Sequence, residues 1–293
     1  MGATHLSHAT SASVTTEALR NICRLVFSRV ALTSTPFRNS VFQQDLILYN
    51  GVPRVDCRLH SEWQERNLMV KVAFPVNAQA DKAEFEIPFG SITRPADGTE
   101  VPALRWVDVS DTASGQGFTL LNDAKYGFDV KGPVIRMSVI HGATAPDPEA
   151  DRGGHEFLYA LFPHAGTWKE AEAHRRGYEL NYPLIARTGM LHAGSLPAER
   201  SFVSAEPAGA VLSSLKMAMG YDSRDLIVRA VEVFGAGTNA VISFPWPVQA
   251  VETDLIERPL KSGLILESAG ERNEIAVPLA RYEIKSFRVV RKR

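Results

Sequence analysis

The sequence lacks the features that mark secreted, membrane-spanning and nucleic-acid-binding proteins. Only two cysteines, Cys23 and Cys57, occur in 293 residues. They could form a bridge, but two thiols in a reducing compartment are expected, which favours a cytoplasmic location. No apolar segment approaches the ~20 residues that cross a bilayer, and residues 1–20 lack the apolar core of a secretory signal. The net charge is −1, so neither nucleic acid nor a membrane is an expected partner.

Several short motifs that mark catalytic or metal sites are also absent. The sequence has no Gly-x-Ser-x-Gly, no Cys-x-x-Cys and no His-x-x-x-His. His155, His164 and His174 lie in or after an acidic loop, but such spacings are unspecific, so this chain alone is expected to hold no metal. Gly235-Ala236-Gly237 lacks a third glycine and a following helix, which indicates a hairpin turn rather than a phosphate-binding loop.

What the sequence does contain is a succession of short strands. Alternating or continuous apolar residues predict strands at 22–30, 41–49, 52–63, 67–76, 83–90, 117–121, 126–130, 134–140, 157–162, 211–215, 226–234, 240–244, 248–255 and 282–290. Asn50-Gly51 predicts a hairpin, and Asn122-Asp123 is a candidate tight turn between two strands. One helix is predicted at 168–180, and a change of composition at 197–209 indicates a domain boundary. The predicted fold class is all-β.

Residues 146–164 contain the highest concentration of side chains that could form a functional site. In the first ten residues, two prolines restrict the backbone and two glycines allow backbone angles that other residues avoid. Asp151, Arg152 and His155 of the same segment supply charge of both signs. The apolar run at 157–162 predicts a strand buried on both faces. A rigid polar loop before a buried strand is typical of a binding site, while a surface turn in which Arg152 pairs with an acid is the alternative.

Two further groups of residues leave alternatives open. The acidic side chains could supply the carboxylate pair of a glycosidase, although a solvated acidic turn has the same composition. The aromatic side chains could stack on sugar rings, although single aromatics in β-sandwiches more often belong to the core. The residues are Asp129, Asp147, Glu149 and Asp151 for the first group, and Trp63, Trp106, Tyr126, Trp168 and Tyr178 for the second.

Motifs in the same order as in a known family run through residues 22–290. They include Trp63-Gln64-Glu65, Ile87-Pro88-Phe89-Gly90, Leu121-Asn122-Asp123-Ala124-Lys125-Tyr126-Gly127-Phe128-Asp129, Asp151-Arg152-Gly153 and Glu252-Thr253-Asp254-Leu255. Together they resemble the C-terminal region of glycoside hydrolase family 38 α-mannosidases. His141-Gly142 departs from the Arg-Ser of many members, and the first twenty residues match nothing in the family.

The resemblance implies an architecture for this chain and a separate catalytic domain. It implies a galactose-mutarotase-like supersandwich at 21–200 and a smaller β-sandwich at 206–293, while the Ser, Thr, Ala and His content of the start predicts a disordered leader at 1–20. The resemblance also implies that terminal α-mannosides are hydrolysed with retention by a zinc-bearing N-terminal barrel absent from this chain, which alone would be inactive and would carry no cofactor. The expected partners are a mannose-containing glycan and that barrel, or another copy of the chain.

The resemblance further implies which residues approach the substrate. Asp151, Arg152 and Gly153, with His155, would form a wall of the sugar pocket, and Asn122, Asp123 and Tyr126 are further candidates. Three alternatives remain open. The chain could be an independent carbohydrate-binding module that uses residues 151–155, or a scaffold that binds nothing and exposes an apolar patch. It could also be a mutarotase that pairs His155 with Glu84 or Asp129.

Overall fold

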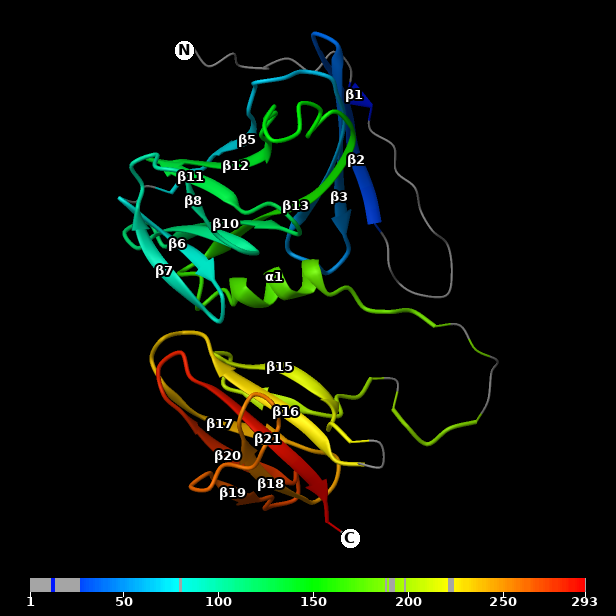
Figure 1. Cartoon of the computed structure of the whole chain (residues 1–293), viewed down its shortest axis with the longest axis vertical. Helices are drawn as coiled ribbons and strands as arrows, with labels where there is room; N and C mark the ends of the chain where they lie inside the picture. Colours follow the sequence, from blue (N-terminus) through cyan, green and yellow to red (C-terminus); the bar gives the residue numbers. More distant parts are fainter. Residues whose placement is uncertain are drawn as a thin grey trace. The chain divides into compact units, whose positions relative to one another are not determined.

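The computed structural model describes residues 12–13, 27–78, 81–187, 189, 193–197, 199–220 and 224–292, with side chains described from Pro36 onward (Figure 1). The predicted leader and Cys23 lie outside these residues, except for the two-residue strand β1 (Ala12–Ser13). The chain divides into two compact units. One comprises Met1–Ile87 with Ile92–Leu184, and the other comprises Pro88–Ser91 with Ile185–Arg293. The domain limits at residues 200 and 206 stay a prediction.

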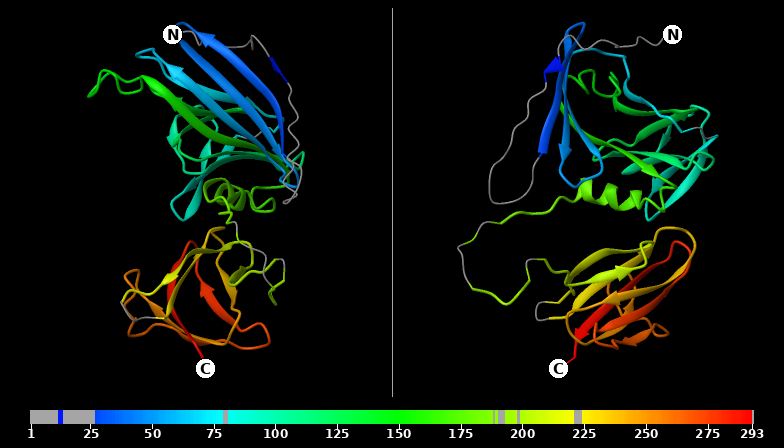
Figure 2. Two further views of the ribbon diagram at one scale, coloured as in Figure 1. Left: turned by 90° about the vertical axis from the view of Figure 1, so that its right-hand side faces the viewer. Right: turned by 180° about the vertical axis from the view of Figure 1, so that it is seen from behind.

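The first unit is built on a nine-stranded antiparallel sheet whose strand order is β1-β2-β3-β4-β13-β10-β9-β6-β7 (Figures 1 and 2). Its strands after β1 are β2 (Phe27–Phe37), β3 (Ser40–Tyr49), β4 (Val55–Trp63), β6 (Lys82–Ile87), β7 (Gly90–Pro95), β9 (Trp106–Asp111), β10 (Gln116–Asn122) and β13 (Gly153–Ala165). β13 occupies the centre because it pairs with β4 along one edge and β10 along the other. The 50–54 connection makes β3 and β4 a hairpin, as Asn50-Gly51 predicted.

A four-stranded sheet closes the first sandwich. Its order is β5-β12-β11-β8, from β5 (Val70–Pro75), β8 (Val101–Pro102), β11 (Gly127–Lys131) and β12 (Val134–Ile140). Side chains of both sheets meet in one buried cluster that includes Leu59, Val107 and Leu120 of the large sheet and Phe128 and Met137 of the small one. Burying one such side chain contributes about 1.5–3 kcal/mol, so this shared core holds the two sheets together.

Two local predictions were wrong. β10 and β11 do not form a hairpin around Asn122-Asp123, because β10 pairs with β9 and β13 while β11 pairs with β8 and β12 in the other sheet. The connection therefore crosses from one sheet to the other. Strand β13 also begins at Gly153 rather than Phe157, so His155 belongs to a strand and not to a loop. Ladder hydrogen bonds to β4 extend this strand beyond its apolar run.

The helix α1 (Ala173–Asn181) is shorter than the predicted 168–180, since residues 168–172 form turns. It contacts β9, β10 and β13 of the large sheet. The rings of Trp106 and Trp168 contact each other in a tilted arrangement, with centroids 4.7 Å apart. A Cβ on Gly177 would lie 3.1 Å from the Trp106 ring, so glycine allows the helix to approach the sheet this closely.

The second unit is a smaller β-sandwich. Its three-stranded sheet is β14-β17-β20 and its five-stranded sheet is β15-β16-β21-β18-β19. The strands are β14 (Ser204–Glu206), β15 (Ala210–Met217), β16 (Leu226–Glu232), β17 (Thr238–Ser243), β18 (Val248–Thr253), β19 (Ile265–Glu267), β20 (Glu274–Leu279) and β21 (Ile284–Arg291). Residues of both sheets, among them Val228, Ile242 and Phe287, form its core. The predicted all-β fold of two sandwiches is confirmed.

Gly235-Ala236-Gly237 does not close a hairpin, because it joins β16 and β17, which belong to different sheets. The buried Glu232 carboxylate accepts hydrogen bonds from the backbone N–H groups of Phe234 and Gly235, both at 2.9 Å, and thereby fixes this turn. No helix in the described part of the chain is long and apolar enough to span a membrane.

Candidate functional site

The candidate site lies where β12 ends and β13 begins, and Asp151 organises it. The Asp151 carboxylate accepts hydrogen bonds from the backbone N–H groups of Gly142, at 2.7 Å, and His141, at 3.2 Å. Gly142 has a φ of 63°, and a Cβ there would lie 2.4 Å from the Leu68 carbonyl oxygen. Glycine therefore stands at 142 where a side chain would clash with this carbonyl.

Arg152 is held in place by two neighbours. Its guanidinium forms an ion pair with Glu149 and donates a 3.0 Å hydrogen bond to Gln64 Oε1. Glu149 also pairs with Arg66, so two arginines share one carboxylate. The Arg152 side chain is nevertheless 39% exposed. Arg152 thus combines both interpretations of the loop, since it pairs with an acid and still presents donors to solvent.

Gly153 and His155 lie at the start of β13, directly after this arginine. The His155 ring nitrogen Nε2 lies 2.8 Å from the Asp151 carbonyl oxygen, and the ring stacks on Phe157 with centroids 5.6 Å apart. Gly153 has a φ of 119°, a conformation that favours glycine, and a Cβ there would meet no atom within 4 Å. Backbone geometry, rather than space, therefore requires glycine at 153.

The structure adds Lys125, a residue that the sequence analysis missed. Its ammonium lies 4.2 Å from the centroid of the Phe157 ring, a cation–π contact. Burial lowers the pKa of Lys125, while the carboxylates of Asp151 and Asp123 act in the opposite direction. Burial also raises the pKa of the Asp123 carboxyl, against hydrogen bonding from Leu158 and the charge of Lys125. Lys125 therefore links the 122–126 segment to the 151–157 segment.

Asn122 and Tyr126 occupy opposite environments. Asn122 is 1% exposed; its amide donates to the Leu104 carbonyl at 2.7 Å, and its side-chain oxygen accepts from the Lys125 backbone N–H at 2.7 Å. Tyr126 is 56% exposed. Asn122 therefore acts on the site through the turn that carries Lys125, and direct substrate contacts by Asn122, Asp123 or Tyr126 stay a prediction.

The carboxylates proposed for mutarotation have partners other than His155. Glu84 accepts a 2.6 Å hydrogen bond from Thr93 on β7, and Asp129 is buried on β11 between Lys71 and Arg136. Neither carboxylate forms an ion pair or hydrogen bond with His155 among the described residues. Within the same residues, no group of three or more His, Cys, Asp and Glu side chains could hold a metal ion.

Comparisons with known proteins agree with this architecture. Residues 7–149 match the model of the glycosyl hydrolases family 38 C-terminal domain, and residues 209–287 match that of the family 38 C-terminal beta sandwich domain. Alpha-mannosidase 2C1 of Homo sapiens is 37% identical over 237 residues, which cover 77% of this chain and 22% of the relative. Alpha-mannosidase G of Dictyostelium discoideum is 28% identical over 269 residues, 87% of this chain and 24% of the relative.

A solved structure shares the fold. The alpha-mannosidase from Enterococcus faecalis V583 superposes with a TM-score of 0.71 at 18% identity, covering 88% of this chain and 30% of the other. Two β-sandwiches that each match a C-terminal domain model place the chain among the C-terminal β regions of glycosyl hydrolases. The chain belongs to family 38 of the glycosyl hydrolases, as part of its C-terminal region. It spans 22–24% of the length of the curated relatives named Alpha-mannosidase 2C1 and Alpha-mannosidase G.

Proposed function

We propose that this chain is the non-catalytic C-terminal β region of a retaining α-mannosidase that hydrolyses terminal α-mannosides. It shapes the sugar pocket and packs on a catalytic barrel that is not part of this chain. The relatives named alpha-mannosidase, of which the chain covers less than a quarter, support this division of labour. The family's zinc does not fit the described residues, because no suitable cluster of side chains exists among them. No metal-dependent step is therefore placed on this chain.

Arg152 is the observation that carries the proposal. Its guanidinium is fixed by Glu149 and Gln64 before any ligand arrives, and part of it faces solvent. A charged donor that is already oriented loses little side-chain freedom when it binds a sugar hydroxyl. Asp151 contributes indirectly, since its carboxylate fixes residues 141 and 142 and its carbonyl oxygen positions His155.

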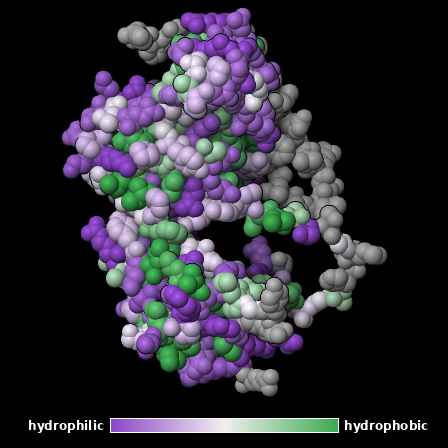
Figure 3. Space-filling model, viewed as in Figure 1, coloured by the Kyte–Doolittle hydropathy of each residue, from purple (hydrophilic) through white to green (hydrophobic). Residues whose placement is uncertain are grey.

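Exposed apolar side chains are consistent with a protein partner. Figure 3 shows apolar residues among polar ones on the face in view. In the second unit, large exposed hydrophobic residues lie at the end of β15 and in the loop after β18. They are Leu215, Met217, Met219, Leu255 and Ile256. Apolar surface of this kind favours burial against another protein surface.

A chimera tests the proposal. In the chimera, this chain replaces the matching C-terminal segment of Homo sapiens alpha-mannosidase 2C1. Hydrolysis of an aryl α-mannoside is measured for the chimera, for the relative without its C-terminal segment, and for this chain alone. The chain alone is expected to be inactive, and the chimera active. Arg152→Ala in the chimera is expected to lower kcat/KM by about tenfold or more, equivalent to ~1.4 kcal/mol of transition-state binding.

The matched control is Arg281→Ala, which removes an exposed arginine of the second unit. It is expected to leave kcat/KM unchanged. Turnover by this chain alone, together with stoichiometric zinc, would contradict the proposal. Equal activity of the relative without any C-terminal segment would also contradict the proposal.

A further inference from the structure

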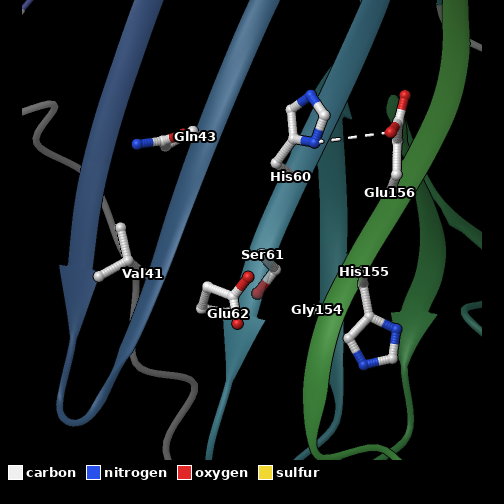
Figure 4. Close-up of a pocket in the computed structure, with 8 residues that line it drawn as sticks. All are labelled: Val41, Gln43, His60, Ser61, Glu62, Gly154, His155 and Glu156. Carbon is white, nitrogen blue, oxygen red and sulfur yellow. Dashed lines mark ion pairs between the residues drawn. The ribbon is translucent and has the colours of Figure 1, made fainter.

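A groove of about 520 Å³ lies on the first unit across β3, β4 and β13 (Figure 4). The residues that line it are Val41, Gln43, His60, Ser61, Glu62, Gly154, His155 and Glu156. Gln43, His60 and Glu156 alternate along their strands with the core residues Phe42, Leu59 and Phe157, so they face away from the core. None of the lining residues except His155 belongs to the candidate site described above.

Strand register arranges the lining residues in two rows. Gln43 lies opposite His60, which lies opposite Glu156. In the next row, Val41 lies opposite Glu62, which lies opposite Gly154. Neighbouring strands are about 4.8 Å apart, and same-face residues along a strand are about 7 Å apart. The six positions therefore form a patch of about the size of one sugar ring.

Gly154 makes the patch hollow. The other five positions carry side chains, whereas glycine leaves the corner beside Glu62 open. A Cβ at Gly154 would lie 3.2 Å from Glu62 Oε1, and its three nearest atoms would all belong to the Glu62 side chain. Its φ is not in the left-handed range. Glycine is thus not required there by the backbone, and its effect is to leave space on the surface.

The groups around the hollow combine donors and acceptors. Glu156 is shared by His60, whose Nδ1 lies 3.8 Å away (Figure 4), and by Arg58 at 3.5 Å. Its charge is therefore already balanced, which disfavours a cationic ligand. Glu62 has no ion-pair partner among the described residues, and Gln43 adds an amide that both donates and accepts. Val41 supplies the single apolar side chain.

We propose that this groove binds one neutral sugar ring through its hydroxyl groups. Vicinal hydroxyls both donate and accept, so they match carboxylate, amide and imidazole groups set side by side on a rigid sheet. The Val41 side chain can contact an apolar C–H face of the ring. This site is separate from Arg152 and does not depend on the proposed role in hydrolysis. It gives the chain a sugar-binding activity of its own.

Titration of the intact chain with D-mannose tests the groove. The imidazole resonance of His60, assigned with His60→Ala, is followed by NMR. Without an aromatic platform, a dissociation constant on the order of 1–10 mM is expected for a ligand of this size. Gly154→Leu fills the hollow and Glu156→Gln removes a charged acceptor. Each is expected to weaken binding at least about tenfold, and the control Arg281→Ala, at an exposed position of the second unit, is expected to leave it unchanged.

Circular dichroism checks that the variants are folded, which is expected because the His60 and Glu156 side chains are 43% and 63% exposed. No shift of His60 up to ~100 mM D-mannose would overturn the inference, because a useful site binds more tightly than that. Unchanged binding in Gly154→Leu would overturn it as well. Binding lost in Arg152→Ala but retained in Gly154→Leu would place the sugar at residues 151–155 instead.

Discussion

The carboxylate of Asp151 accepts a hydrogen bond from the backbone N–H of Gly142 at 2.7 Å. This contact ties the start of β13 to the segment that follows β12. The neighbouring N–H of His141 donates to the same oxygen at 3.2 Å. Because Arg152 follows directly in the chain, the position of its guanidinium depends on this anchor.

Asp151→Ala is expected to lower the stability of the first unit. Two backbone N–H groups lose their acceptor, which costs about 1–3 kcal/mol where solvent does not replace it. Urea unfolding at neutral pH measures the change. Asp81→Ala, at an exposed position with no described side-chain partner, is the control and is expected to change stability by less than ~0.5 kcal/mol. Equal midpoints for the two variants would show that Asp151 is not an anchor.

Asn122→Ala tests whether that residue acts as a structural group. Its side chain bonds the Leu104 carbonyl and the Lys125 N–H in a buried position, so truncation leaves both groups without a partner. A loss of about 2–4 kcal/mol is expected from two unsatisfied groups. Tyr126→Phe, at an exposed site, is expected to be neutral. A stable Asn122→Ala variant that only loses mannoside turnover in the chimera would instead indicate direct substrate contact.

The sequence predicted strands best where alternation follows burial on one face. In β4, Cys57, Leu59 and Trp63 are buried while Arg58 and Glu62 are exposed. This alternation with a period of two can be recognised in the sequence alone. β9 was missed, although Trp106, Val107, Asp108 and Val109 are all buried. An acidic residue inside a buried run interrupts the apolar pattern from which a strand is predicted. Here Asp108 is satisfied by Thr119 and His164, residues far along the chain.

The site was predicted only in part because sequence order does not reveal pairing. β10 and β11 were expected to form a hairpin, yet they belong to different sheets. That crossing brings Lys125 over Phe157, a contact between segments thirty residues apart. The groove on β3, β4 and β13 was missed for the same reason. Its rows depend on the pairing of β4 with β13, in which residues roughly a hundred positions apart lie opposite each other.

Lys71 and Glu100 predict how the first unit responds to acid. Burial lowers the pKa of Lys71, but hydrogen bonds to Asp129 and Glu100 outweigh it and leave the pKa raised. Burial raises the pKa of Glu100, but hydrogen bonds from Lys71 and Ser138 outweigh it and leave the pKa below 4.5. The Glu100 contribution is therefore complete above its unfolded pKa and is lost as pH falls through the lower folded value.

Glu100→Gln is accordingly expected to reduce stability at neutral pH by less than about 1 kcal/mol, since both side chains are partly exposed. The difference from wild type should vanish at pH values below the folded pKa of Glu100. Urea midpoints measured from acid to neutral pH give this profile. A difference that persists in acid would refute the assignment.

Cys57 is expected to be inert in the folded protein. Its side chain is fully buried, and burial, with a smaller effect from Asp56, raises the pKa of the thiol from 9.0 to about 12. Because the thiolate is the reactive form, an aromatic disulfide reagent at mildly alkaline pH should not modify it without unfolding. The assay uses Cys23→Ser, which leaves Cys57 as the single thiol, with a urea-unfolded sample as the control for complete labelling. Rapid modification of the native variant would mean that the strand pairing of β4 opens readily, and that the core of the first unit is less closed than its buried side chains indicate.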